Sequence, residues 1–141
     1  MPAARRLALI LVAVLALAAC GSGHSKSSSQ AQIKSAYEKF FSGKTSISDH
    51  VALLQNGPQF KGLVTSFLSN PLAKNVSATV KSVTLQGPNK AKVVYTPKLG
   101  GSALPTQTGA AVRQNGTWKV ADATLCKLVA LGGSTPSVCK S

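Results

Sequence analysis

Acidic side chains are nearly absent from this sequence. Its 141 residues contain 3 Asp or Glu, against 16 Lys or Arg. We expect Glu38 to be solvated beside the apolar stripe of a predicted helix, Asp49 and Asp122 to lie at helix caps, and His50 to lie at the surface. Acid–base catalysis needs carboxylates or histidines with tuned pKa values inside a pocket. With no Ser/His/Asp set, phosphate-binding loop or metal-ligand cluster in the sequence, we expect no enzyme, no cofactor and no metal site.

Aromatic residues are also scarce, at 5% of a chain whose net charge is +13. In the cytosol, so basic a protein would be a candidate nucleic-acid binder. Single-stranded nucleic acid is bound by basic grooves with interleaved aromatic side chains, and these lysines are not interleaved with aromatics. We therefore expect no nucleic-acid partner. The charge favours solubility and adhesion to anionic surfaces instead.

No apolar run is long enough for a comfortable bilayer span, which takes about 20 residues. The run LALILVAVLALAA at residues 7–19 is uncharged and follows Arg5 and Arg6. A short apolar run after a basic start is typical of a signal peptide that is removed after export. A signal anchor that is never cleaved is the alternative. The paired arginines leave open whether export uses the general or the twin-arginine route.

Residues 17–20 read LAAC and make the prediction more specific. Leucine, two small residues and cysteine resemble the lipobox of bacterial lipoproteins, whose cysteine carries diacylglycerol with acyl chains such as palmitate. Two acyl chains anchor a protein firmly, whereas one anchors it only marginally. We therefore predict cleavage before Cys20, a lipid anchor on Cys20, and a place on the extracytoplasmic face of the cell membrane. Partial release of the protein is the alternative.

Cysteine is rare too, with three in the chain. An odd thiol is unusual in an exported protein. If Cys20 carries lipid, Cys126 and Cys139 remain as a natural disulfide pair, and closing their short loop would stabilise the fold by about 3 kcal/mol. Two buried free thiols are the alternative. Zinc is less favoured, because these two cysteines lack the neighbouring Cys or His ligands of a tetrahedral site.

Three segments follow from these signals: a signal peptide at residues 1–19, a lipidated cysteine with a flexible tether at residues 20–30, and a single domain at residues 31–141. The tether sequence GSGHSKSSSQ is too polar to bury surface. Once Arg5 and Arg6 are removed, 14 basic and 3 acidic side chains remain, a net charge of +11. The sequence shows no internal repeat and no second domain.

Helical periodicity predicts three helices at the start of the domain. Apolar positions 33, 36, 37, 40 and 41 form one stripe on a helix that starts near Ser29 and ends at Gly43. A short helix capped by Ser48 or Asp49 follows and ends at residues 56–57. A third helix starts around Pro58, repeats the stripe at positions 60, 63, 64, 67 and 68, and ends at residues 70–71.

The apolar period then changes to two, which predicts an antiparallel sheet. Positions 76, 78 and 80 alternate with polar residues, and a shift of parity after Lys81 predicts a bulge. A second strand has positions 91, 93 and 95 facing inward. In a third, positions 110 and 112 share one face and 111 and 113 the other. The Asn-Gly turn at 115–116 leads to a strand with Trp118 and Val120 inward, and Asp122 or Thr124 would cap a closing helix that ends at residues 132–133. These elements predict an α+β fold with helices on one sheet face.

Six segments of the sequence together carry a family resemblance: YEKFFSGKT at 37–45, ALLQNG at 52–57, PLAK at 71–74, SATV at 77–80, QTG at 107–109 and NGTWKV at 115–120. They resemble the low-molecular-weight antigen family of mycobacteria and related actinobacteria, and the resemblance covers about residues 31–131. It implies an exported, antigen-like cell-envelope protein with a cone-shaped α+β fold like that of nuclear transport factor 2, N-terminal helices packed on a curved antiparallel sheet, and no established catalytic residues.

Two binding hypotheses remain beside the enzyme that composition disfavours. In the first, the protein carries a small apolar ligand or lipid in a cavity, although so few aromatics favour a solid core. The aromatic residues that could line such a cavity are Tyr37, Phe40, Phe41, Phe60, Phe67, Tyr95 and Trp118.

In the second hypothesis, the sheet carries a basic patch. Lys92, Arg113 and Lys119 share the strand parity that faces away from the predicted core, toward which Tyr95, Val112 and Trp118 are expected to point. If their strands are neighbours, they form one outer basic surface suited to anionic envelope lipids or polymers. A merely solvated face is the alternative. We therefore predict a non-enzymatic envelope lipoprotein that acts by binding or surface interaction; its oligomeric state is left open.

Overall fold

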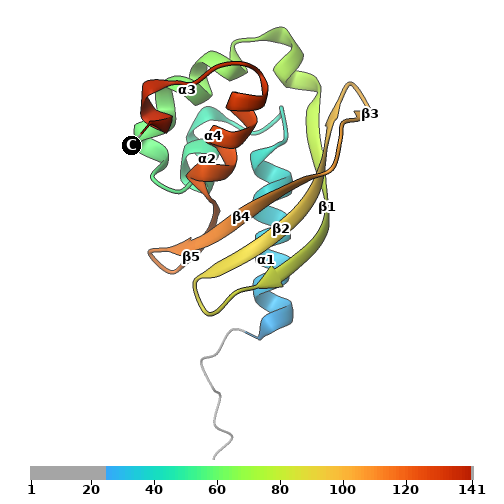
Figure 1. The fold of residues 1–141 in the computed structure, drawn as a ribbon, viewed down its shortest axis with the longest axis vertical. Coiled ribbons are helices and arrows are strands. Elements are labelled where there is room, and N and C mark those ends of the chain that lie inside the picture. Colours follow the sequence, from blue (N-terminus) through green and yellow to red (C-terminus); the bar gives the residue numbers. More distant parts are fainter. Residues whose placement is uncertain (1–24, 141) are drawn as a thin grey trace, which may run out of the picture.

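The computed structural model describes residues 25–140, so the predicted signal peptide and Cys20 lie outside the described residues. Figure 1 shows a curled antiparallel sheet with α1 behind it and with α2, α3 and α4 gathered toward one end. The predicted α+β class is confirmed. The elements in chain order are α1 (Lys26–Phe40), α2 (Ile47–Leu53), α3 (Gly57–Leu68), the 3-10 helix η1 (Pro71–Asn75), β1 (Val76–Leu85), β2 (Lys90–Leu99), β3 (Ser102–Ala103), β4 (Gln107–Gln114), β5 (Thr117–Val120), α4 (Asp122–Leu131) and the 3-10 helix η2 (Ser137–Cys139).

The first helix begins before its predicted position. Ser25 is the N-cap, and its Oγ accepts a backbone hydrogen bond of 3.2 Å in the first turn, so α1 starts at Lys26. Residues 26–30, assigned to the tether from sequence, therefore belong to this helix. Ser29 is buried, and the Gln30 amide donates to the Val83 carbonyl at 2.9 Å. Contacts with the sheet, which composition does not reveal, thus order a polar segment.

The next two helices lie where the sequence predicts them, but α2 has a different cap. Ser46 Oγ accepts the Asp49 N–H at 3.1 Å and donates to the Asp49 carboxylate at 2.8 Å. The predicted caps, Ser48 and Asp49, lie inside the helix. Asn56 has a positive φ of 53° and turns the chain into α3. A side chain at Gly57 would collide with the backbone of α2, so this tight turn requires glycine.

The sheet has the strand order β1-β2-β4-β5, and each neighbouring pair is antiparallel. β3 pairs with the end of β2. The register of β1 against β2 shifts between Val80 and Ser82, which confirms the bulge predicted after Lys81. Because a bulge strengthens the local twist, it contributes to the curl of this sheet.

The parity of β4 is opposite to the predicted one. Ala111 pairs with Ala91 of β2 and with Val120 of β5, and all three are buried on the inner face. Val112, predicted to face inward, pairs instead with exposed Lys90. The physical reason is Gly109, which has the same parity as Ala111. A Cβ at Gly109 would come within 2.6 Å of a tyrosine hydroxyl, so the crowded inward position is taken by the residue without a side chain.

Other segments of the chain contact both outer edges of the sheet: α1 along β1 and the turn after α2 along β5. Along β1, the Glu38 carboxylate of α1 accepts the Val80 N–H at 3.4 Å. Along β5, Leu54 forms a parallel bridge with Val120, and the Gln55 N–H donates to the Val120 carbonyl at 2.8 Å. Open strand edges are templates for pairing with other chains. These contacts occupy backbone groups that such pairing would use.

The last helix starts at Asp122 with Ala121 at the N-cap and without a side-chain cap. Thr124, one of the two predicted caps, is instead buried, and its Oγ1 accepts the Ala110 N–H at 2.9 Å. The predicted disulfide between Cys126 and Cys139 is present, with Cα atoms 5.5 Å apart. It ties the C-terminal segment back to α4.

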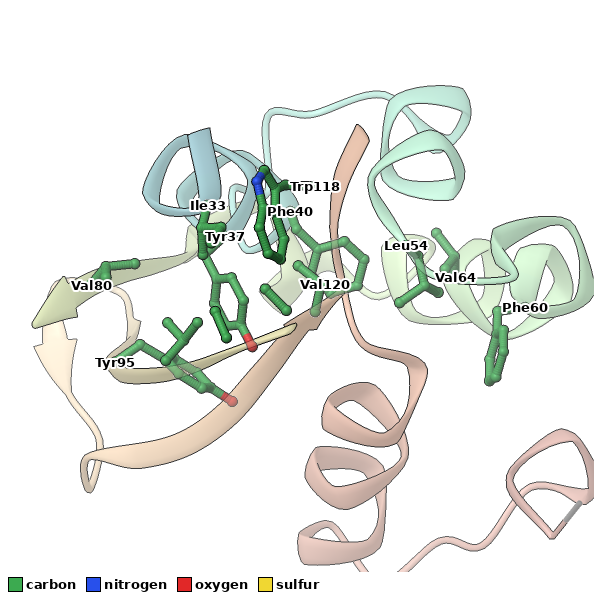
Figure 2. Packing of buried hydrophobic residues seen from close by; sticks show 13 residues of the cluster. Ile33, Tyr37, Phe40, Leu54, Phe60, Val64, Val80, Tyr95, Trp118 and Val120 are labelled. Carbon is green, nitrogen blue, oxygen red and sulfur yellow. The ribbon is translucent and has the colours of Figure 1, made fainter. Parts of the chain in front are cut away.

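The core lies between the inner sheet face and the helices. In Figure 2, Ile33 and Tyr37 of α1 lie against Val80, Tyr95 and Val120 of the sheet. A second group continues the same cluster: Leu54, which follows α2, and Phe60 and Val64 of α3. The helical stripes predicted from sequence therefore supply one side of this core, and the inner face of the sheet supplies the other.

Candidate functional site

The outer face of the sheet is basic. Lys90 pairs with Val112, and Val112 pairs with Lys119, so the three side chains form one row across β2, β4 and β5. Lys92 lies two residues further along β2 on the same face. Lys90 and Lys92 are exposed and Lys119 is half-buried. The structure thus brings together two residues of the predicted patch, Lys92 and Lys119, and adds Lys90; Figure 1 shows α1 on the opposite side of the sheet.

Arg113 does not belong to this outer face. It pairs with Trp118 across β4 and β5, and the inverted parity of β4 turns both side chains inward. Its guanidinium carbon lies 4.9 Å from the centre of the Trp118 ring, and its Nη2 donates to Ser29 Oγ at 3.4 Å. A cation over an indole face is electrostatically favoured. Placing Arg113 in the outer patch from sequence was therefore wrong.

Two polar atoms at this inner position lack a hydrogen-bond partner within residues 25–140. They are Arg113 Nε and Trp118 Nε1, and both are buried. Trp118 is 3% exposed, so its Nε1 could not form a hydrogen bond with bulk water without a local opening. The ring contact compensates part of the cost of burying the guanidinium.

The hydroxyl of Tyr37 joins three elements inside the molecule. It donates to the Ala110 carbonyl of β4 at 2.6 Å and lies 3.4 Å from Thr124 Oγ1 of α4. Burial raises the pKa of Tyr37 well above the ordinary tyrosine value. The hydroxyl therefore stays protonated at physiological pH and serves as a donor that holds the helices on the sheet.

The aromatic side chains predicted to line a cavity do not all lie in one group. Phe41 stacks on Tyr95 with ring centres 5.0 Å apart, and Tyr37 lies 5.2 Å from the same ring. Burial raises the pKa of Tyr95 to about 12. Trp118 is buried beneath Arg113, whereas Phe67 of α3 is 54% exposed and lies outside the core cluster. Phe67 therefore does not fit the predicted lining.

Among the hollows on the surface of the described region are two that are not lined by these aromatic residues. One lies along the exposed side of α1 around Lys34, Glu38 and Lys39. The other lies between Lys44, η1 and the glycines at 100–101. Both are open to solvent, and both have lysines in their lining.

The titratable residues that could serve catalysis lie apart. Glu38 accepts a hydrogen bond from a backbone N–H at the β1 edge. Asp49 accepts a hydrogen bond from the Ser46 hydroxyl, and Asp122 Oδ2 accepts one from the Asn56 side-chain amide at 2.9 Å. Within residues 25–140, no three His, Cys, Asp or Glu side chains gather as possible metal ligands. Each carboxylate has a structural partner.

His50, predicted at the surface, is buried at 5% exposure. Its Nδ1 lies 2.8 Å from the Ser46 carbonyl oxygen, and its ring packs against Phe40 with ring centres 5.6 Å apart. The prediction was wrong because α2 turns this residue toward α1. Its position after a cap gave no information about the neighbouring helix.

Sequence reasoning missed the polar residues that hold the interior together. Ser29 and Thr124 are buried hydrogen-bonding groups, and nothing in their neighbours distinguishes them from surface serines and threonines. Gly109 did carry a usable signal. A glycine inside a strand pattern indicates a close approach of another group, here Tyr37 and Thr124.

The chain is similar to a known protein family. Residues 26–136 match the family model described as the low molecular weight antigen MTB12, C-terminal domain. No curated protein matches the chain. The match starts at the first residue of α1 and ends before η2, so it spans the folded region almost completely. None of the helices in residues 25–140 has the length and apolar character needed to cross a membrane.

Proposed function

Because the chain belongs to the low molecular weight antigen family, we propose that it is an exported, antigen-like cell-envelope lipoprotein without enzymatic activity. In this proposal, a signal peptide at residues 1–19 directs export, and Cys20 carries the lipid that holds the protein on the extracytoplasmic face of the membrane. The folded domain then acts by binding at the envelope surface, through its basic outer sheet face.

The observation that carries the lipid anchor is the pattern of residues 5–20. Two arginines, an uncharged apolar run and LAAC occur in the order that export and lipid attachment require. The disulfide is consistent with an oxidising compartment, and it accounts for the two cysteines other than Cys20. The three cysteines thereby receive two distinct roles.

The basic outer face supports a binding role rather than a catalytic one. Lys90, Lys92 and Lys119 share this face, and the three carboxylates of the chain are engaged elsewhere. A lipid-carrier role has less support, because Phe67 is exposed and the remaining predicted lining residues pack on one another. Anionic envelope lipids and polymers are the partners that this charge favours.

Intact mass spectrometry of protein purified from its native membrane tests the anchor. We expect a mass that corresponds to residues 20–141 with diacylglycerol added and with one disulfide. The variant Cys20→Ala should accumulate as uncleaved precursor, whereas the matched control Ser22→Ala should be processed normally. A mature protein that starts elsewhere, or that carries no added lipid mass, would refute the lipoprotein assignment.

A further inference from the structure

We propose that the domain docks with one particular end on the anionic headgroups of the membrane that anchors it. We name this the proximal end and define it by three parts: the first turn of α1 with Lys26, the β1–β2 turn at residues 86–89 with Lys90 and Lys92, and the β4–β5 turn at residues 115–116. Figure 1 shows all three at the end where the described chain begins. The inference rests on the proposed lipid at Cys20.

Hydrogen bonds hold the three parts of the proximal end together. The Arg113 N–H donates to the Asn89 carbonyl at 2.9 Å, which joins β4 to the β1–β2 turn. The Arg113 guanidinium donates to Ser29 of α1 at 3.4 Å, and Gln30 of α1 donates to Val83 of β1 at 2.9 Å. The three parts of the proximal end therefore keep fixed positions relative to one another.

The length of chain between Cys20 and the domain restricts the orientation. Four residues lie between Cys20 and Ser25, and the five steps along the chain span at most about 18 Å in any conformation. A strand of ten residues, such as β2, is about 33 Å long. The proximal end must therefore stay close to an anchored Cys20, while the opposite end can lie well clear of the headgroups.

The charge at the proximal end suits an anionic membrane surface. Lys26, Lys90 and Lys92 are exposed there. Glu38, on the same helix as Lys26, lies twelve residues along it, a distance of about 18 Å. The exposed apolar residues Phe67 and Leu72 lie in α3 and η1, toward the other end. Lysines near an anionic leaflet are attracted to it within about one Debye length.

The experiment uses the lipidated mature protein in vesicles of phosphatidylcholine with or without phosphatidylglycerol. A fluorophore is attached at Asn89→Cys, at the proximal end, or at Ser102→Cys in β3, toward the opposite end. A quencher attached to lipid headgroups reports which label is near the membrane. We expect strong quenching of the Asn89→Cys label in anionic vesicles, weaker quenching in neutral ones, and little quenching of the Ser102→Cys label in either.

Charge variants identify the lysines responsible. The triple variant Lys26→Gln, Lys90→Gln and Lys92→Gln should lose most of the difference between anionic and neutral vesicles, since each lysine changes the docked-to-free ratio about fivefold. A control with the same net charge, Lys61→Gln, Lys74→Gln and Lys140→Gln, removes exposed lysines elsewhere. It should behave like the parent protein, and added salt should weaken docking of both parent and control.

The possible failures are distinguishable. A purified protein without acyl mass would overturn the proposed anchor and this inference together. An acylated protein whose Asn89→Cys label is quenched no more than its Ser102→Cys label would leave the anchor intact and overturn the docking. Equal losses in the two triple variants would also overturn it, because net charge rather than the proximal end would then be responsible.

Discussion

At the scale of single residues, one tyrosine hydroxyl links three elements in the interior. The Tyr37 hydroxyl reaches from α1 to the Ala110 carbonyl of β4 and lies beside Thr124 of α4. From the sequence, Tyr37 was placed correctly on the buried stripe, because the spacing of apolar positions fixes which face of a helix is buried. Its hydrogen-bond partners are far away along the chain, and no local pattern identifies them.

Replacing Tyr37 with Phe should lower the free energy of unfolding by about 1 kcal/mol. The loss is limited because the Ala110 carbonyl keeps the hydrogen bond from the Ala121 N–H at 2.9 Å. Urea titration followed by circular dichroism measures the change. Tyr95→Phe is the matched control, since the Tyr95 hydroxyl makes no hydrogen bond to residues 25–140, and it should cost less than about 0.5 kcal/mol. Equal losses in the two variants would contradict the assigned role of the Tyr37 bond.

Arg113 shows why charge is difficult to place from sequence. Arg113 and Val112 are neighbours in a strand, so their side chains lie on opposite faces of the sheet. The alternation alone does not say which of the two faces meets the core. Val112 is the more apolar residue, and it nevertheless lies outside because Ala111 and Gly109 fit the crowded inner face. The ring of Trp118 then accommodates the inward guanidinium.

At the scale of elements, most helices and strands follow from periodicity. α3, the bulge in β1 and the hairpin between β4 and β5 lie where apolar spacing and the Asn-Gly turn place them. The start of α1 and the cap of α2 differ, because hydrogen bonds of Ser25 and Ser46 decide them. Many serines in this chain could form such caps, so composition alone does not select among them.

The contact between β4 and the helices gives a direct test of the observed parity. Gly109→Ala would bring a methyl group within 2.6 Å of the Tyr37 hydroxyl and 2.7 Å of Thr124 Cγ2. We expect a loss of about 1–3 kcal/mol in the free energy of unfolding, because the neighbours must move.

Gly62→Ala in α3 is the matched control, since nothing lies within 4 Å of the added methyl group. This exposed helical position should gain up to about 1 kcal/mol, because alanine favours helix more than glycine does. Thermal and chemical denaturation of both variants measure the difference. Were Gly109→Ala tolerated as well as Gly62→Ala, the inward position of Gly109 would be wrong.

At the scale of the whole molecule, the dominant property is uncompensated charge. Residues 20–141 carry 14 basic and 3 acidic side chains. The carboxylates that the structure describes are engaged by neutral donors rather than by lysine or arginine. Like charges repel one another through the folded state, and salt screens this repulsion.

The Tm of the protein should therefore rise by a few degrees between low salt and physiological ionic strength, as measured by calorimetry in NaCl. Glycerol at the same osmolarity controls for solvent effects that do not depend on ions. A Tm that falls as salt increases would mean that attractive charge pairs outweigh the repulsion.

The fold class and the disulfide could be predicted from sequence, because both follow from local spacing and from counting cysteines. The basic outer face of the sheet could be predicted only in part. Lys92 and Lys119 were assigned correctly to the outer face, whereas Lys90 was overlooked and Arg113 was misplaced. The proposed docking of the domain rests on which turns meet around the first residues of α1, and that requires the three-dimensional arrangement.

The disulfide also has a consequence for how the C-terminal segment meets proteases. The chain from Cys126 to Cys139 forms a closed ring with the sulfur bridge, and its glycine pair at 132–133 is exposed. A single cut in that exposed stretch would not release the end of the polypeptide, because the bridge keeps both fragments attached. Nicked protein would remain one molecule, heavier than the intact chain by one water, until a reductant broke the disulfide.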